Sequence, residues 1–398
     1  MRSNDVDVLI AGGGLAAQRT AETLRRLGYD GRVRVLCDEP HAPYDRPPLS
    51  KAVLTGERGP ETPLLRPARW YAEHEVELLL GARAAFVDPT ARRVRLQDGA
   101  WLRYGRLVIA TGSRPRRLPM LPLGDKVREL RTIDDARALR DALSRDIERL
   151  AIVGAGLVGM EVASSATALG IAVTLIEAAP TPLGRALPPA LGSWLAALHT
   201  RAGVEVLLGR AVNGVRDNGG RVELELNDGQ RIASDLVLVA AGSAPATEWL
   251  ADTALGCAGA IHVDAGGRTA VPQIYAAGDA ACFPDPATGS HIPTQHWEAA
   301  AHQGAAVARA IVGAPSEAAQ PPMFWSDQHG VRIQFVGHAE QADRIDIEGV
   351  LDAPDFTAWL MRGEDPVGAL LAGRPRALPD ARGRIAAART SNELPVAA

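Results

Sequence analysis

The stretch AIVGAGLVGMEVASSATALGIAVTLIEA, residues 151–178, decides how this chain folds. It reads as an apolar strand, a glycine turn with GxGxxG spacing, a helix ending at Leu169-Gly170, and a second strand ending in the acid Glu177. The stretch VLIAGGGLAAQRTAETLRRLGYDGRVRVLCDE, residues 8–39, has the same order of elements, with three extra residues after its helix. A βαβ unit written twice predicts an α/β fold with two Rossmann-like, dinucleotide-binding domains.

The glycines of the first turn have separate tasks. Gly12 permits a tight turn after the strand, and Gly14 lets the backbone approach a pyrophosphate that a side chain would obstruct. Ala17 stands where a third glycine often stands, and it still allows close packing of the helix. The helix expected from Leu15 to Leu27 then points its positive N-terminal end at the phosphates. The first-turn residues predicted to hold a dinucleotide are Gly12, Gly14, Leu15, Ala16 and Ala17.

The second unit carries the full glycine set: Gly154, Gly156 and Gly159. Each unit also ends in an acid, Asp38 or Glu177, that can accept hydrogen bonds from ribose hydroxyls. Glu177 would repel a 2′-phosphate, which favours NAD over NADP, although Arg185 on the following loop could reach such a phosphate. A duplicated scaffold with one inactive site is the alternative to two sites. Two sites imply two dinucleotides: a mobile nicotinamide and a resident flavin.

Composition limits the class of protein. The 398 residues exceed one ordinary core, so two or three domains are expected. The net charge of −4 gives no basic excess, which argues against nucleic-acid binding. No apolar run approaches a membrane span, and the N-terminal sequence lacks the pattern of a signal peptide, so we expect no membrane insertion and a cytoplasmic location.

The cysteines restrict the chemistry further. Cys37, Cys257 and Cys282 are far apart and form no CxxC, which excludes a zinc knuckle or a vicinal redox dithiol. We expect buried thiols, no metal, and histidines that are satisfied or exposed.

The repeat continues downstream. Residues 94–115 parallel residues 222–245, and in both a hairpin turn, Asp98-Gly99 or Asp228-Gly229, leads into a buried strand and a small-residue turn. A proline-rich linker at residues 315–322 precedes a C-terminal stretch of alternating apolar and polar residues, which predicts an α+β domain with an antiparallel sheet.

Six segments carry a resemblance to a known family. They are PYDRPPLSKAVLTGE (residues 43–57), ATGSRP (110–115), LRTIDDA (130–136), VDAGGRTAVPQIYAAGDAA (263–281), HWEAAAHQG (296–304) and FWSDQ (324–328). Their order resembles the FAD-dependent, putidaredoxin reductase-like ferredoxin reductases of Rieske-type aromatic dioxygenase and bacterial haem monooxygenase systems. The resemblance covers nearly the whole chain and is weakest after about residue 372.

The resemblance implies an NADH-dependent flavoprotein, a monomer or weak homodimer, in which a hydride passes from NADH to FAD and single electrons pass to a [2Fe–2S] ferredoxin. It also implies three domains: a split FAD domain at residues 1–113 and 243–321, an NAD domain at 114–242, and a C-terminal domain at 322–398 that covers the flavin. The FAD contacts it implies, beyond the first turn and Asp38, are Arg46, Lys51, Thr111, Gly112, Arg131, Gly278, Asp279 and Trp297. The nicotinamide-side contacts are Gly154, Gly156, Leu157, Val158, Gly159, Glu161, Glu177, Arg185 and Gly242.

Two residues are assigned roles nearest the chemistry. Lys51 is a cation that would stabilise a reduced, anionic flavin, and Glu161 pairs with Lys51 when no nicotinamide is present and accepts from the carboxamide when one is. Because the cofactors perform the hydride transfer, no obligatory acid or base is expected. Each residue also has a plainer interpretation: an exposed loop lysine for Lys51, a solvated helix carboxylate for Glu161, a helix N-cap for Asp279 and a core aromatic for Trp297.

Rival functions stay open. An NADH oxidase, a rubredoxin reductase or a monodehydroascorbate reductase could use the same scaffold, although an oxidase would need a redox cysteine near the flavin. A redox-sensing interaction protein of the apoptosis-inducing-factor type is a rival from another class. The ferredoxin surface is expected to be locally basic. The candidate arginines are Arg309, Arg344, Arg362, Arg374 and Arg376.

Overall fold

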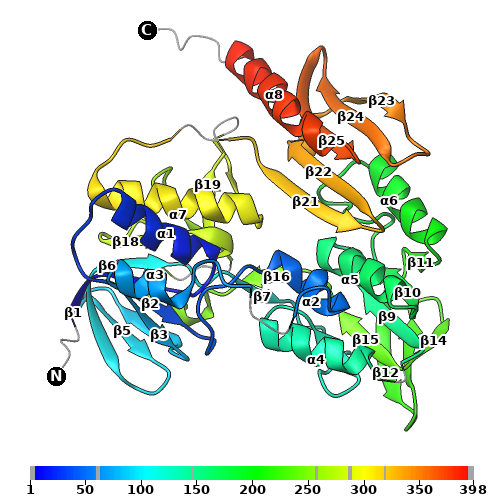
Figure 1. The fold of residues 1–398 in the computed structure, drawn as a ribbon, viewed down its shortest axis with the longest axis horizontal. Coiled ribbons are helices and arrows are strands. Elements are labelled where there is room, and N and C mark those ends of the chain that lie inside the picture. Colours follow the sequence, from blue (N-terminus) through cyan, green and yellow to red (C-terminus); the bar gives the residue numbers. More distant parts are fainter. Residues whose placement is uncertain are drawn as a thin grey trace. The chain divides into compact units, whose positions relative to one another are not determined.

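The computed structural model describes residues 5–59, 63–145, 147–255, 259–285, 289–317 and 320–392. Residue contacts divide the chain into two compact units (Figure 1). Unit 1 comprises Met1–Asp45, Thr62–Arg114 and Ala244–Pro322, and unit 2 comprises Arg46–Glu61, Pro115–Ser243 and Met323–Ala398. The strands β7 (Ser113–Pro115) and β16 (Ser243–Pro245) lie where the chain passes between units.

Unit 1 is built on a mixed sheet in the order β3-β2-β1-β6-β5-β4, with β18 pairing on β6. Strands β1, β2, β3, β6 and β18 run parallel, whereas β4 and β5 are antiparallel additions. The carboxyl-terminal parts of β1 and β6 and all of β2 are buried, because both faces of the sheet are covered there. The strands of this sheet are β1 (Asp5–Ala11), β2 (Val33–Cys37), β3 (Val76–Leu80), β4 (Ala84–Asp88), β5 (Arg93–Leu96), β6 (Trp101–Ile109) and β18 (Ile274–Ala276). Unit 1 also contains β17 (Ile261–His262), β19 (Ala281–Pro284) and β20 (His291–Ile292), which lie outside this sheet.

Two helices lie side by side over this sheet, α1 (Leu15–Arg26) and α7 (Trp297–Val312) (Figure 1). Gly304 makes their close approach possible, since a Cβ there would come within 2.4 Å of the Ala16 carbonyl oxygen. The Thr20 hydroxyl donates to the Ala16 carbonyl at 2.8 Å and lies 3.1 Å from that of Gly304. This contact fixes the C-terminal part of unit 1 against its first βαβ element. The remaining unit 1 helices are α3 (Ala68–Glu73) and the short η2 (Glu248–Leu250) and η3 (Gly278–Ala280).

Unit 2 contains the second βαβ repeat in a parallel sheet of order β11-β10-β9-β15-β8, with an antiparallel β12-β13-β14 sheet beside it. The helices are η1 (Pro47–Ser50), α2 (Ala52–Thr55), α4 (Ile133–Leu143), α5 (Leu157–Ala168) and α6 (Pro189–Arg201). The strands are β8 (Val127–Glu129), β9 (Arg149–Val153), β10 (Ala172–Glu177), β11 (Glu205–Leu208), β12 (Val212–Asp217), β13 (Val222–Leu226), β14 (Arg231–Ser234) and β15 (Leu236–Val239).

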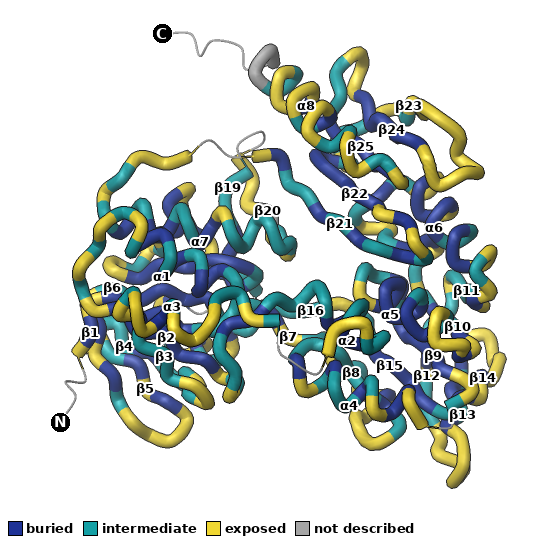
Figure 2. Tube along the Cα trace, in the orientation of Figure 1, coloured by how far each residue is buried: buried dark blue, intermediate teal, exposed yellow. Residues whose placement is uncertain are grey.

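The C-terminal part of unit 2 is an antiparallel sheet of order β21-β22-β25-β24-β23. One continuous apolar core joins it to the parallel sheet, and in that core the ring of Trp194 on α6 meets Phe356 on β24 edge to face at 4.9 Å. Figure 2 shows mostly dark blue, buried residues along β9 and β22, whereas β23, at the edge of its sheet, is largely yellow. The elements are β21 (Met323–Gln328), β22 (Val331–Gly337), η4 (Ala339–Gln341), β23 (Arg344–Val350), β24 (Asp355–Arg362), β25 (Asp365–Ala372), η5 (Pro375–Ala377) and α8 (Leu378–Asn392).

The predicted fold class is therefore confirmed: two Rossmann-like regions and a C-terminal α+β region with an antiparallel sheet. Residues Arg46–Glu61 group with unit 2, together with the second βαβ repeat and the C-terminal sheet. The three-domain division stays a prediction. Within the described ranges, no helix is both long and apolar enough to cross a membrane.

Candidate functional site

The first glycine turn joins β1 to α1 in unit 1. Gly12 has a φ of +130°, and a Cβ there would lie 2.0 Å from the Ala110 carbonyl oxygen, so only glycine fits. Gly14 differs, because its φ of −94° suits any residue and a Cβ would meet nothing within 4 Å. No side chain caps α1, and its first turn holds no acid. The open space before an uncapped helix N-terminus fits a bound pyrophosphate.

The second glycine turn, in unit 2, repeats this geometry. Gly154 has a φ of +112°, and its Cβ would lie 2.3 Å from the Ala240 carbonyl oxygen. A Cβ on Gly159 would come within 2.0 Å of the Gly154 carbonyl oxygen, so α5 packs tightly on the turn. Gly156 again has open space around it, and no side chain caps α5. Each turn thus has at least one glycine that close backbone contacts require, and one, Gly14 or Gly156, whose missing side chain leaves room for a ligand.

The two strand-end acids are in different surroundings. The Asp38 carboxylate is 62% exposed and lies 3.8 Å from the Arg83 guanidinium. Glu177 accepts hydrogen bonds from the backbone N–H groups of Ala155 at 2.7 Å and Ala179 at 2.8 Å, so it braces the second glycine turn. Arg185, on the following loop, is exposed. The role of each carboxylate toward a ribose stays a prediction.

A second set of predicted residues in unit 1 follows β6 and β18. The Ser113 hydroxyl donates to Asp279 at 2.6 Å, and the Thr111 hydroxyl donates to the Ala246 carbonyl at 2.7 Å. The Trp297 indole N–H, at the start of α7, donates to Asp45 at 2.7 Å. Trp297 is half-buried. Gly112 and Gly278 both have positive φ, so these turns also depend on glycine.

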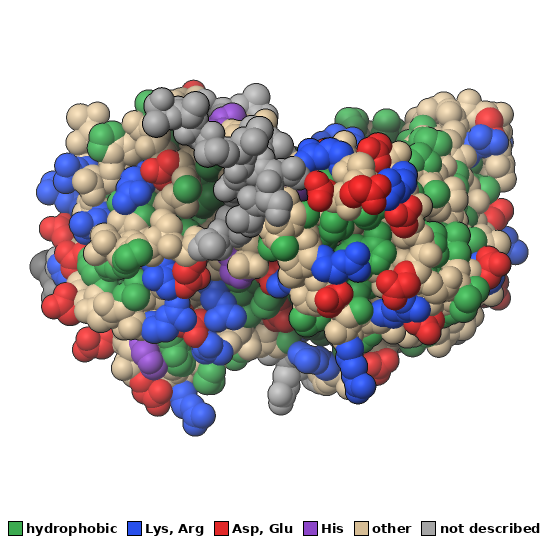
Figure 3. All heavy atoms as spheres, turned by 90° about the horizontal axis from the view of Figure 1, so that it is seen from above, with side chains coloured by type: hydrophobic (Ala, Val, Ile, Leu, Met, Phe, Trp, Pro, Cys, Tyr) green, Lys and Arg blue, Asp and Glu red, His purple; other side chains and the backbone are tan. Residues whose placement is uncertain are grey.

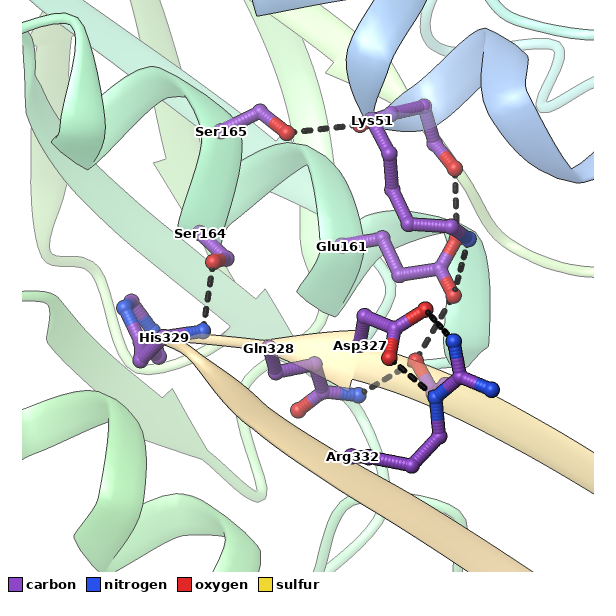
Figure 4. Close-up of polar contacts among 10 residues, drawn as sticks. Lys51, Glu161, Ser164, Ser165, Asp327, Gln328, His329 and Arg332 are labelled. Carbon is purple, nitrogen blue, oxygen red and sulfur yellow. Dashed lines mark hydrogen bonds and ion pairs between the residues drawn. The ribbon is translucent and has the colours of Figure 1, made fainter. Parts of the chain in front are cut away.

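In unit 2 a buried carboxylate gathers three donors (Figure 4). Glu161 on α5 is 5% exposed. Its Oε1 lies 2.7 Å from the Lys51 ammonium and accepts from the Ser326 hydroxyl at 2.7 Å, while its Oε2 accepts from the Ser50 hydroxyl. Burying a carboxylate is costly unless its oxygens are satisfied, and these three groups satisfy them.

The short RPPLSK segment is held to the same helix. The Ser165 hydroxyl, one turn after Glu161, donates to the Ser50 carbonyl at 2.7 Å. The Arg46 guanidinium donates to the Arg131 carbonyl at 2.6 Å, just before α4. Lys51 and Glu161 therefore form the ion pair that we expected from the sequence.

The described cysteines do not form a redox site. Cys37 and Cys282 are buried, and Cys257 lies outside the described residues. Burial, aided by the charge of Glu39, raises the pKa of the Cys37 thiol to about 12, so it is not a thiolate at neutral pH. Cys37 packs under the first glycine turn, because a Cβ on Gly13 would meet its sulfur at 2.7 Å.

A family model described as pyridine nucleotide-disulphide oxidoreductase matches residues 6–304. The chain belongs to this family. A second model, described as reductase C-terminal, matches residues 323–397. Unlike family members that reduce disulfides, this pyridine nucleotide-disulphide oxidoreductase has no CxxC.

Relatives within the family cover nearly the whole chain. The 3-phenylpropionate/cinnamic acid dioxygenase ferredoxin–NAD(+) reductase component of Photorhabdus laumondii is 35% identical over 94% of this chain and 94% of its own. The benzene 1,2-dioxygenase system ferredoxin–NAD(+) reductase subunit of Pseudomonas putida is 38% identical over 86% and 83%. The covalent putidaredoxin reductase–putidaredoxin complex is 32% identical, with a TM-score of 0.91 over 96% of this chain and 93% of the matched one.

The structure thus places every predicted site residue in one of two units. Unit 1 holds the first turn, Asp38, Thr111, Gly112, Gly278, Asp279 and Trp297, whereas unit 2 holds Arg46, Lys51, Arg131 and all the predicted nicotinamide contacts. Leu157 is half-buried and Val158 is 41% exposed, both on the first turn of α5. Their roles toward a cofactor stay predictions.

Sequence reasoning missed Ser326, the hydrogen-bond partner of Glu161 on β21, and Gln328, which bonds to Ser326. Ser326 and Gln328 are buried within FWSDQ, whose alternation places every second side chain on the inner face. Two buried polar residues on the inner face of a strand were the available signal, because such groups need partners.

The candidate arginines for a partner surface are largely matched by acids. Arg344 lies 3.1 Å from Asp346, Arg374 lies 2.7 Å from Asp355, and Arg309 pairs with Glu317. Figure 3 shows positive and negative side chains interspersed on the face it presents. These residues define no concentrated basic patch by themselves.

Proposed function

We propose that this chain is an NADH-dependent ferredoxin reductase that supplies single electrons to a [2Fe–2S] ferredoxin of an oxygenase system. The observation that carries the proposal is the duplicated glycine turn, with open space at Gly14 and again at Gly156. One chain with two such turns suits two dinucleotides. Membership of the family and the printed names of relatives, which are ferredoxin–NAD(+) reductases, support the same reaction.

FAD is assigned to the first turn. Gly14 leaves room for its pyrophosphate, Asp38 suits its ribose, and Asp279 and Trp297 are proposed to orient the rest of the cofactor. Arg46, Lys51 and Arg131 are further residues proposed to contact FAD, and Arg46 is fixed by its bond to the Arg131 carbonyl. When bound, FAD takes a hydride from NADH and releases the electrons singly to an iron–sulfur protein.

NADH is assigned to the second turn. The open space at Gly156 receives the pyrophosphate, and Leu157 and Val158 present N–H groups on the first turn of α5. The braced Glu177 carboxylate favours a ribose with a free 2′-hydroxyl, and Arg185 and Gly242 are proposed to line the same site. Lys51 provides positive charge that Glu161 balances until the nicotinamide binds.

The proposed reaction uses NADH and a small iron–sulfur protein, so we infer a cytoplasmic location and no nucleic-acid partner. A monomer or weak homodimer suffices because each chain carries both proposed sites. The ferredoxin is a transient partner, and Arg362 and Arg376 stay candidates for its docking surface together with the three paired arginines.

The test is NADH-driven cytochrome c reduction by the purified holoprotein, with and without a [2Fe–2S] ferredoxin from an oxygenase system. We expect ferredoxin to raise the rate at least about tenfold, because it relays single electrons that cytochrome c accepts poorly from the flavoprotein directly. A rate unchanged by every ferredoxin in such a panel, with rapid oxygen consumption instead, would identify an NADH oxidase. A stable NADH complex with slow turnover would instead indicate a redox sensor.

A further inference from the structure

A chain of polar side chains runs from Glu161 to helix α6. From the Ser326 hydroxyl, already bonded to Glu161, the next link is the Gln328 amide, whose Nε2 donates to that hydroxyl at 3.0 Å. The Gln328 Oε1 lies 3.0 Å from Nε2 of His199 on α6, and the His199 Nδ1 lies 3.0 Å from Nε2 of His329. Three contacts therefore connect Glu161 to His199, and a fourth joins His199 to His329, all within unit 2.

The middle of this series of side chains is buried away from water. Ser326 and Gln328 are each 1% exposed, and His199 is fully buried. His329, at the far end, is half-buried, and its backbone N–H donates to the Ser164 hydroxyl on α5 at 2.7 Å (Figure 4). Buried polar groups destabilise the fold unless each is satisfied, and here each side chain forms a hydrogen bond with its neighbour.

The direction of every hydrogen bond follows from the charge of Glu161. Its carboxylate only accepts, so Ser326 donates to it and accepts from the amide nitrogen of Gln328. The amide oxygen of Gln328 then faces His199, whose Nε2 must carry the proton. A neutral His199 has an unprotonated Nδ1, which accepts from the Nε2–H of His329.

The surroundings of His199 agree with this assignment. Burial lowers the pKa of His199 to about 4, against a smaller raising effect from the Gln328 hydrogen bond. His199 is therefore neutral at pH 7, as the bonding pattern requires. Burial also lowers the pKa of His329. Among the described residues, Glu161 is the only carboxylate hydrogen-bonded to the side chains of this series, which are Ser326, Gln328, His199 and His329.

We propose that Ser326, Gln328 and His199 are positioning residues, which hold the Glu161 carboxylate in a fixed orientation beside Lys51 by a one-way series of hydrogen bonds. The proposal rests on the proposed function for the role of Glu161 toward nicotinamide. It adds that the C-terminal sheet and α6 control the geometry of that site. It also makes the proton position on His199 a reporter of the charge on Glu161.

The first test reads the tautomer of His199 by imidazole nitrogen NMR of the full-length holoprotein. We expect wild-type His199 to be neutral with its proton on Nε2. Glu161→Gln replaces an acceptor-only group by one that can donate, so Ser326 and Gln328 can reverse and the His199 nitrogen shifts should change. An Nδ1–H tautomer in the wild type, or His199 shifts unaffected by Glu161→Gln, would overturn the proposal. This readout does not depend on catalysis.

The second test separates positioning from stability. His199→Phe removes the donor to Gln328, and we expect the KM for NADH to rise about tenfold with a smaller change in kcat, because a buried acceptor is left unsatisfied. His199→Gln places an amide N–H where Nε2 stood and should restore KM to within about threefold of wild type. Leu195→Ala, fully buried on the same helix, is the control that loses stability and keeps KM.

These results separate a failure of the hydrogen-bond proposal from a failure of the proposed function. If His199→Phe is as well folded as the wild type and has the same KM for NADH, the series of hydrogen bonds has only a structural role. Failure of His199→Gln to restore KM would contradict the donor role. Absence of any flavin reduction by NADH in the wild type would overturn the proposed function, while the tautomer measurement would still decide whether the hydrogen-bond series exists.

Discussion

Replacing Gly14 with valine should give a folded protein that is largely free of flavin. The φ of Gly14 is open to valine and a Cβ there meets nothing within 4 Å, so the fold has no reason to resist the change. The new side chain would occupy the space assigned to the FAD pyrophosphate. We expect FAD affinity to fall about a hundredfold or more, equivalent to about 2.7 kcal/mol, measured as flavin bound per chain and by titration of the apoprotein.

The matched control is the same substitution in the second turn. Gly156→Val is also sterically open, and it should retain flavin while its affinity for NADH falls. By contrast, Gly12→Val would collide with the Ala110 carbonyl, so its flavin loss would report misfolding rather than binding. A Gly14→Val protein with normal yellow colour and stoichiometry would show that the first turn does not hold FAD.

The second large effect is expected at the acid that ends β10. Glu177→Arg exchanges a carboxylate that repels a 2′-phosphate for a guanidinium that can bind one. We expect the ratio of kcat/KM for NADPH to that for NADH to rise about a hundredfold. The measurement is steady-state reduction of an artificial acceptor with each nucleotide.

The hydrogen bonds of Glu177 decide which variant is a suitable control for this substitution. Because Glu177 also accepts from the N–H groups of Ala155 and Ala179, its loss loosens the glycine turn. Glu177→Gln keeps the side-chain length and one acceptor oxygen, so it should weaken NADH use without any gain for NADPH. Selectivity that is the same in Glu177→Arg and wild type would remove the assignment of this carboxylate to the ribose.

The repeat made much of the fold predictable. The helix expected from Leu15 to Leu27 is α1, Leu15–Arg26, and both predicted hairpins are present as β5–β6 and β13–β14. These elements depend on local signals, namely apolar periodicity and glycine turns, which a sequence displays directly. Helix α8 was not located from the sequence, because Ala381 and Ile385 are the only buried residues between 378 and 389, too few to produce a periodic pattern.

The candidate site was predictable in part for the same reason. The glycine turns and their acids lie within short segments, and a family resemblance brought Lys51 and Glu161 together. The hydrogen bonds behind Glu161 join three segments that are far apart in the sequence, namely those of Glu161, His199 and Ser326–Gln328, so no local pattern links them. The burial of β21 shows that FWSDQ turns Ser326 and Gln328 inward, and its packing against α5 and the hydrogen bond from Gln328 to His199 on α6 explain why.

The central claim is that one chain holds a resident FAD and a visiting NADH that reduces it. Anaerobic titration of the purified holoprotein with NADH, followed by the visible absorption of the flavin, tests this most directly. We predict complete bleaching at about one NADH per bound FAD, because one hydride carries both electrons the flavin accepts. Protein that stays colourless after reconstitution with FAD, or flavin that keeps its colour with excess NADH and NADPH, would contradict the claim.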